Sequence, residues 1–125
     1  MEKHEYENIR EYSDVAIASA LRNDDIRALR EIVIDVALRH EDFVFAEQLC
    51  RSLSANYDEE LRGNAILGFG HLARRFSRLS EIDVRPIIEA GLLDSSEYVR
   101  GQSWAAADDI SHFLKWTIAG YESEE

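Results

Sequence analysis

The sequence contains one pattern three times, an acidic turn followed by an apolar residue and an arginine: Asp24-Asp25-Ile26-Arg27, Asp58-Glu59-Glu60-Leu61-Arg62 and Asp94-Ser95-Ser96-Glu97-Tyr98-Val99-Arg100. The arginine recurs after 35 residues (27 to 62) and again after 38 (62 to 100). A period of this length is typical of stacked helical hairpins, in which each hairpin covers the apolar face of its neighbour. The pattern therefore predicts an all-α, α-solenoid-like stack of three antiparallel helix pairs.

Composition supports a single helical domain over residues 1–125. One proline and six glycines leave few residues for the turns of a many-stranded sheet, and the β-branched residues do not alternate with polar ones. The apolar runs are too short to cross a membrane, and residues 1–5 are charged where a signal peptide would be apolar. Cys50, the one cysteine, lies in an apolar helical series. We expect a cytoplasmic protein with no membrane contact, in which Cys50 has a packing role.

The charge is strongly negative. The chain has 25 Asp and Glu against 14 Lys and Arg, which gives a formal charge of −11. Residues 1–60 hold 15 acidic and 7 basic side chains (net −8), and residues 61–125 hold 10 and 7 (net −3). Such a surface repels phosphate backbones, so direct binding of nucleic acid is not expected. It can attract a basic protein partner, although acidic surfaces also serve solubility.

Helical periodicity divides the chain into three units, residues 13–39, 41–78 and 82–117, followed by an acidic tail over 118–125. Ser13 or Asp14 can cap the first helix, and Glu41-Asp42 suits the start of the second unit.

Glycine and proline set further expectations for the second and third units. Gly63, Gly68 and Gly70 lie inside a predicted helix, where each costs about 1 kcal/mol relative to alanine, so close helix contact is the expected compensation. Pro86 is expected within the first turn of its helix. Asp94 and Glu97 have the spacing of a capping box before the last helix.

The paired helices, the turn aspartates and the small residues after Arg62 and Arg100 resemble HEAT repeats over residues 13–117. The resemblance implies a ladder in which turn aspartates bind arginines of successive repeats. In this chain the ladder residues would be Asp24 or Asp25, Asp58 and Asp94 with Arg27, Arg62 and Arg100. The first unit departs from the pattern, because Leu29 and Arg30 stand where small residues are expected.

Enzymatic chemistry finds little support in the sequence. HEAT-like deoxyhypusine hydroxylases bind di-iron through repeated His-Glu pairs, and His4-Glu5 and His40-Glu41 are two such pairs, with no third or fourth. Asp108 and His112 lie one helical turn apart without further ligands. HEAT-like DNA glycosylases need a basic groove, which the acidic composition opposes. We therefore expect no enzyme, no cofactor and no metal, with a metal-dependent hydroxylase as a distant alternative.

A binding surface is the remaining expectation. Val99, Ala106, Ile110 and Phe113 are predicted to face the core of the last helix, which places the two tryptophans and neighbouring polar residues outside it. Tryptophan beside carboxylates is typical of interface hot spots, although the same rings could cover the end of the stack. The candidate partner-binding residues, which include acids along the second helices, are Asp24, Asp25, Glu31, Asp35, Glu59, Glu97, Trp104, Asp108, Asp109, His112 and Trp116.

Two classes of function fit this surface. A small, acidic, helical-repeat protein resembles the immunity proteins that bacteria pair with nuclease toxins, whose phosphate-binding clefts are basic. Such a protein would act by occluding the cleft. The alternative is a general HEAT-like adaptor that assembles other proteins or forms a homodimer through its open repeat ends.

Overall fold

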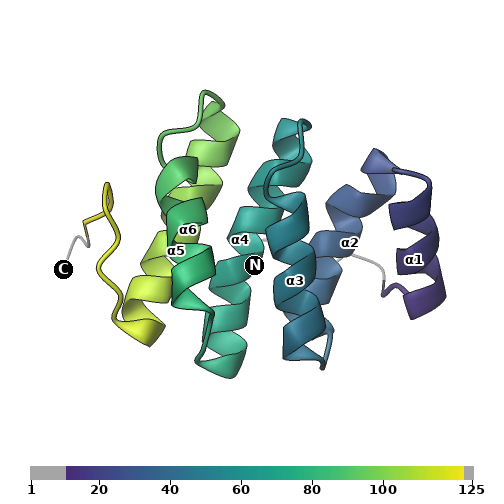
Figure 1. Ribbon diagram of the computed structural model, residues 1–125, viewed down its shortest axis with the longest axis horizontal. Helices are drawn as coiled ribbons and strands as arrows, with labels where there is room; N and C mark the ends of the chain where they lie inside the picture. The colour runs from purple at the N-terminus through teal and green to yellow at the C-terminus, as the bar shows by residue number, and fades with distance from the viewer. Residues whose placement is uncertain (1–10, 123–125) are drawn as a thin grey trace, which may run out of the picture.

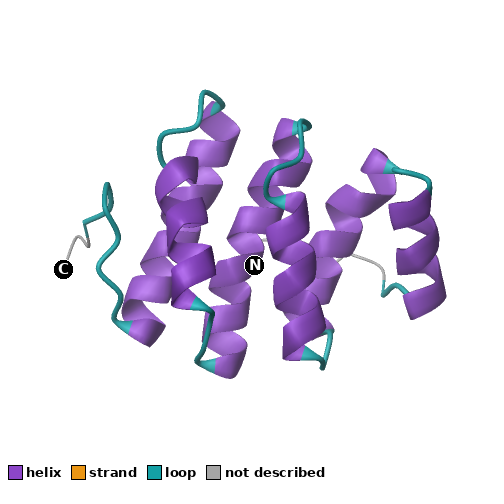
Figure 2. Cartoon of the chain, in the orientation of Figure 1, coloured by secondary structure: helices purple, strands orange, loops and turns teal. Residues whose placement is uncertain are grey.

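A computed structural model describes residues 11–122, and these residues form six helices and no strand (Figure 2). The helices are α1 (Asp14–Arg22), α2 (Ile26–Arg39), α3 (Phe43–Leu53), α4 (Glu59–Phe76), α5 (Glu81–Gly91) and α6 (Glu97–Leu114). The expected all-α fold is confirmed. No helix in this part of the chain has the length and apolar character that crossing a membrane requires.

The helices are arranged as three antiparallel pairs in a row, α1–α2, α3–α4 and α5–α6 (Figure 1). The turns within the pairs lie along one edge of the row, and the α2–α3 and α4–α5 connections lie along the opposite edge. The second helices form the continuous part of the core, because α4 packs against both α2 and α6 as well as α3 and α5. Side chains on the second helices are thereby held in fixed positions relative to one another.

Side-chain caps explain where most helices begin. The side chains of Ser13, Asp25, Asp42, Asp58 and Ser96 each accept a hydrogen bond from the backbone amide three residues later, and this bond satisfies an otherwise unpaired amide of the first turn.

One predicted helix start needs correction, and another has an unusual first residue. The capping box at Asp94 and Glu97 was wrong, because Ser96 is the cap of α6 and Asp94 accepts the Ser96 amide at 2.9 Å. At the start of α5, Ser80 does not cap the helix with its side chain. Its amide and hydroxyl instead donate to the buried carboxylate of Glu47 at 2.7 and 2.8 Å.

An arginine–aspartate ladder links successive pairs. Arg30 of α2 donates through Nε and Nη2 to both oxygens of Asp58, at 2.9 and 2.7 Å. Arg62 of α4 binds both oxygens of Asp94 in the same way, at 2.9 Å each. Each aspartate lies in the turn of the following pair, so each bidentate bond ties a second helix to the next pair and helps to set their register.

The predicted membership of the ladder was partly wrong. Arg30, and not Arg27, forms the first rung, and Arg27 is exposed three residues before it. Arg100 donates instead to the backbone carbonyls of Asp94 and Ser95, in its own turn. Asp25 caps α2 and takes no part in a rung.

Glycine lets α4 approach its neighbours, as predicted. A Cβ at Gly68 would lie 2.6 Å from the sulfur of Cys50 and 3.2 Å from the Cβ of Ala37. A Cβ at Gly70 would lie 3.1 Å from the backbone of Ala106 in α6. Cys50 is fully buried here, and burial raises the pKa of its thiol to about 12, which agrees with a packing role.

The position of Pro86 in the third pair differs from the expectation. Pro86 is the sixth residue of α5, beyond the first turn. The ring removes the amide that would bind the carbonyl of Ile82, and both residues are exposed, so water can replace that bond.

The chain after α6 differs from the separate acidic tail that was predicted over residues 118–125. The helix ends at Leu114, earlier than residue 117, and Lys115 follows in the left-handed conformation with φ 61°. Ile118 and Tyr121 are then 3% and 9% exposed, so the segment returns to the core. The final residues of the predicted tail, 123–125, lie outside the described residues.

The ladder should contribute to the free energy of unfolding. Asp94→Asn, which removes the charge at the second rung, is expected to cost about 1–3 kcal/mol in chemical denaturation. Glu60→Gln is the control, because Glu60 makes one exposed 3.5 Å contact with Arg30 and its loss should change stability by less than about 0.5 kcal/mol.

The ladder also predicts the direction of acid sensitivity. The hydrogen bond from Arg62 lowers the pKa of Asp94 below its ordinary value of 3.8, and Arg30 lowers that of Asp58. The contribution of both rungs is therefore complete at neutral pH and is lost as the pH falls below 3.8 through the lowered pKa values. If Asp94→Asn and Glu60→Gln lower the free energy of unfolding by the same amount at neutral pH, the ladder does not stabilise the fold.

Gly68→Ala should destabilise the protein by about 1–2 kcal/mol, because the added methyl group overlaps the sulfur of Cys50. In a Cys50→Ala background the same change should cost less, since the overlapping atom is gone. Gly101→Ala is the matched control: no atom lies within 4 Å of a Cβ there, and a gain of about 0.5–1 kcal/mol is expected. Thermal or urea unfolding of the four variants measures these differences.

Candidate functional site

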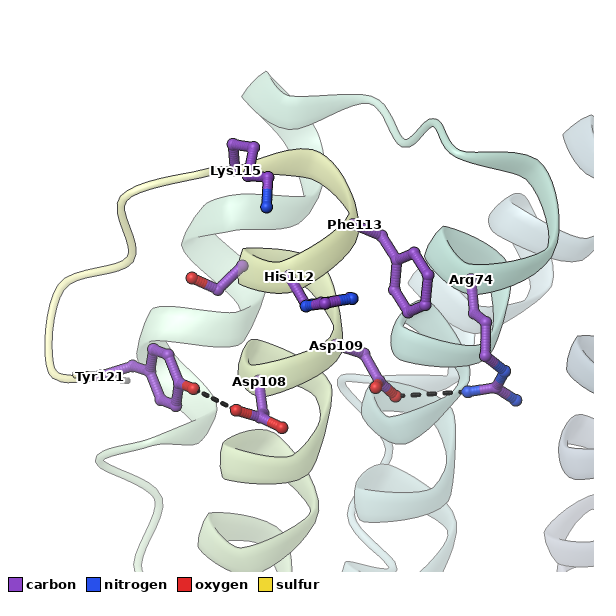
Figure 3. Close-up of a pocket in the computed structure, with 8 residues that line it drawn as sticks. Arg74, Asp108, Asp109, His112, Phe113, Lys115 and Tyr121 are labelled. Atoms are coloured by element: carbon purple, nitrogen blue, oxygen red, sulfur yellow. Dashed lines mark hydrogen bonds and ion pairs between the residues drawn. The ribbon is translucent and has the colours of Figure 1, made fainter. Parts of the chain in front are cut away.

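The last two turns of α6 line a polar cleft of about 530 Å³. Asp108, Asp109 and His112 project from one side of α6, with Arg74 of α4 on one flank and Tyr121 of the returning chain on the other (Figure 3). Three predicted partner-binding residues therefore meet in one place. We call this the C-terminal cleft; its lining residues are Arg74, Asp108, Asp109, Ser111, His112, Phe113, Lys115 and Tyr121.

Hydrogen bonds hold both walls of the cleft. The Tyr121 hydroxyl donates to Oδ1 of Asp108. Arg74 contacts Oδ2 of Asp109 at 3.4 Å and lies 3.0 Å from Nδ1 of His71. The single long contact between Arg74 and Asp109 contrasts with the bidentate rungs of the ladder, so this pair holds its two helices less firmly.

Asp109 lies partly inside the wall between α4 and α6. Burial raises the pKa of its carboxyl group, the neighbouring charge of Asp108 raises it further, and Arg74 and His112 act in the opposite direction. Asp109 is therefore more easily protonated than an ordinary aspartate, while Asp108 is exposed at the mouth of the cleft.

The two tryptophans occupy different environments. Trp104 is 40% exposed, and its ring meets that of Tyr121 edge-on at a centroid distance of 4.7 Å. It therefore supports the returning chain and still presents a face to solvent. Trp116 does not continue a stripe with Asp109 and His112, because α6 ends before it; its half-buried ring packs on the core. Phe113 was expected in the core but is 38% exposed in the cleft.

Four predicted acids lie along the edge formed by the turns within the pairs. Asp24 and Asp25 lie between α1 and α2, Glu59 begins α4, and Glu97 begins α6 (Figure 1). All four are exposed. Asp25 caps α2, and Glu59 accepts a hydrogen bond from the hydroxyl of Ser96. We call this set the turn edge.

The remaining two acids have internal contacts. Asp35 is 3% exposed, accepts the Tyr12 amide at 3.1 Å and binds Arg39, so its placement on a partner-binding surface was wrong. Its position among the buried residues of α2 is tolerated because Arg39 and the Tyr12 amide provide hydrogen bonds to its carboxylate. Glu31 is exposed and accepts the hydroxyl of Tyr12 at 3.0 Å.

Sequence reasoning missed several residues of the cleft. Arg74 is absent from the predicted binding residues, and Tyr121 was placed in the acidic tail. Gly120 was a usable signal in the sequence for the return of Tyr121, because a glycine after a helix often marks a turn, and a turn can bring the following aromatic residue back onto the helix. In the structure Gly120 has a φ of 88°. The pairing of Arg74 with Asp109, 35 residues away, depends on the contact of α4 with α6.

The side chains that could ligate a metal are the histidines and carboxylates of the His-Glu pairs and of α6. Within the described part of the chain, no three His, Cys, Asp or Glu side chains are grouped so as to hold an ion. His40 is committed to protein contacts: its Nδ1 accepts the Asp42 amide at 3.1 Å, and its Nε2 lies 3.3 Å from Asp14. The pair His4-Glu5 lies outside the described residues.

Comparison with known proteins gives a structural likeness. No family model and no curated protein matches the chain, so the HEAT resemblance stays a prediction. A chain from the crystal structure of a CDI complex from Cupriavidus taiwanensis LMG 19424 is similar to it, with a TM-score of 0.72 at 21% sequence identity. The match covers 89% of this chain and 98% of the other. At this identity the likeness shows a shared fold.

Trp104→Ala should lower the free energy of unfolding by about 1–2 kcal/mol, because it removes the ring that supports Tyr121. Tyr57→Ala is the matched control, since Tyr57 is 77% exposed and should change stability by less than about 0.5 kcal/mol. Thermal unfolding of both variants measures the difference. Equal stability of the two variants would show that the Trp104 ring does not support the returning chain.

Proposed function

We propose that this protein is an immunity protein, which neutralises a toxin by binding it and performs no chemistry itself. The observation that carries the proposal is the likeness to a chain of a CDI (contact-dependent inhibition) complex, which extends over nearly the whole length of both chains.

The charge favours a basic toxin, most plausibly a nuclease. An enzyme that cuts nucleic acid must bind phosphate with Lys and Arg, so its active cleft attracts an acidic surface. This chain has a formal charge of −11, and the turn edge places four exposed carboxylates along one side of the row. Binding there would block the toxin's cleft by steric exclusion and by occupying its cations.

The C-terminal cleft and Trp104 would supply the less mobile part of the contact. Trp104 offers an exposed aromatic surface on a rigid helix, and Asp108 lies exposed beside it. Charges at the turn edge would then determine mainly the association rate, and the aromatic contact mainly the dissociation rate.

The test is co-expression in the cytoplasm, where we propose the protein acts. The chain is expressed with the toxin domain encoded beside its gene in the native host, and growth is compared with that of cells expressing the toxin domain alone. Restored growth and a stable purified complex are expected. An adaptor would bind without restoring growth, and binding without protection would therefore favour that alternative.

Neutralising the turn edge should slow association with the toxin domain. Asp24→Asn with Glu97→Gln is expected to lower the association rate constant by about threefold to tenfold at low salt, and the difference should disappear near about 0.5 M salt. Tyr57→Ala is the control on the same edge, because it changes no charge. Surface plasmon resonance over a salt series measures the rates, and association that is indifferent to salt would contradict electrostatic steering.

A further inference from the structure

Three hollows on the surface of residues 11–122 differ in the charge of their lining. In the C-terminal cleft, Arg74 and Lys115 balance the two aspartates. A hollow of about 420 Å³ between α3 and α5 has Asp83 opposite Arg51. The third, of about 330 Å³, lies between α1 and α3 and contains two aspartates and no Lys or Arg; its lining residues are Asp14, Ile17, Ala18, Leu21, His40, Asp42 and Phe45. We call this third hollow the α1–α3 groove.

The floor of the α1–α3 groove is apolar. Ile17, Ala18 and Leu21 come from α1, and Phe45 faces them from α3. Leu21 is 40% exposed. The groove remains open because α1 packs mainly on α2, whereas α3 packs on α2 and α4.

The apolar side of α1 extends beyond the groove. Val15 lies one turn before Ala18, which lines the groove, and Val15 is 79% exposed. A single exposed aliphatic residue is ordinary, but this one continues the apolar side that α1 presents to the groove.

Two carboxylates line the groove. The side chain of Asp14 is 87% exposed, and Asp42, which caps α3, is exposed as well. Nδ1 of His40 accepts the Asp42 amide, so the ring carries its proton on Nε2 and directs it toward Asp14 at 3.3 Å. The groove thus combines an apolar floor with an acidic rim, and the rim faces no arginine or lysine among the lining residues.

We propose that the α1–α3 groove binds a cationic amphipathic segment of the toxin, in which an aliphatic or aromatic side chain is flanked by Lys or Arg. This inference rests on the proposed function for the identity of the partner. Charge complementarity favours it: residues 1–60 have a net charge of −8, and a second copy of this chain would bring its own charge of −11 to the same rim. The groove lies at the end of the row opposite to the C-terminal cleft, so it is a second contact surface (Figure 1).

Small aromatic probes test the ligand chemistry without the toxin. Phenethylamine, 2-phenylethanol and phenylacetate share one ring and differ in charge, and each can be titrated into the full chain while methyl NMR signals are recorded. Phenethylamine should shift the methyl signals of Ile17, Ala18 and Leu21 most strongly and phenylacetate least. The shifts should weaken near about 0.5 M salt.

Amino-acid substitutions test whether phenethylamine binds in the α1–α3 groove. Asp14→Asn should weaken phenethylamine binding by about twofold to fivefold, whereas Glu60→Gln on the opposite edge should leave it unchanged. Leu21→Lys should abolish the shifts, and unchanged methyl signals of the distant core will show that this variant is folded. Equal shifts with phenylacetate, shifts confined to the C-terminal cleft, or no shifts would each overturn the proposal.

The toxin domain supplies the second measurement. Leu21→Lys should raise the dissociation constant for the toxin domain at least tenfold, while Tyr57→Ala should not. Full binding by Leu21→Lys would refute the groove as a contact and leave the immunity function intact. If the wild-type chain protects no cell from the toxin, the proposed function fails, and the phenethylamine titration still decides the chemistry of the groove.

Discussion

α4 lies between α2 and α6, and its close packing there holds the three helix pairs in one row. The approach is close enough that Gly68 and Gly70 leave no ordinary space for a Cβ atom. The two ladder rungs act on the same helices, because Arg30 reaches from α2 to the turn before α4 and Arg62 reaches from α4 to the turn before α6. Packing thus sets the distance between the second helices, and the bidentate bonds set their register.

The C-terminal cleft depends on this arrangement. Arg74 and Asp109 meet only because α4 and α6 run side by side, and Tyr121 reaches Asp108 only because the chain turns back after Lys115. The first helices are less constrained. α1 packs mainly on α2, and its apolar side toward α3 stays partly open. The fold therefore places a polar cleft at one end of the row and an apolar, acid-rimmed groove at the other (Figure 1).

Under the proposed function, the distribution of charge gives these surfaces different roles in binding. Exposed carboxylates on the turn edge act over about one Debye length and favour encounter with a basic partner. Apolar contacts at Trp104 and in the α1–α3 groove act only after encounter, when water is excluded. An inhibitor needs both properties, since rapid association limits damage by the toxin and slow dissociation prevents its release.

The sequence by itself determined the helical fold, its three-pair period, the helix starts near Ser13 and Asp42, and the close approach at Gly68. These features follow from local chemistry and spacing, which are properties of short stretches. Tertiary structure alone decided that Arg30 replaces Arg27 in the ladder, that Asp35 is buried, and that Tyr121 folds back on Trp104. Each of these depends on which residues of separate helices meet, and helical periodicity fixes the faces of a helix but not its neighbours.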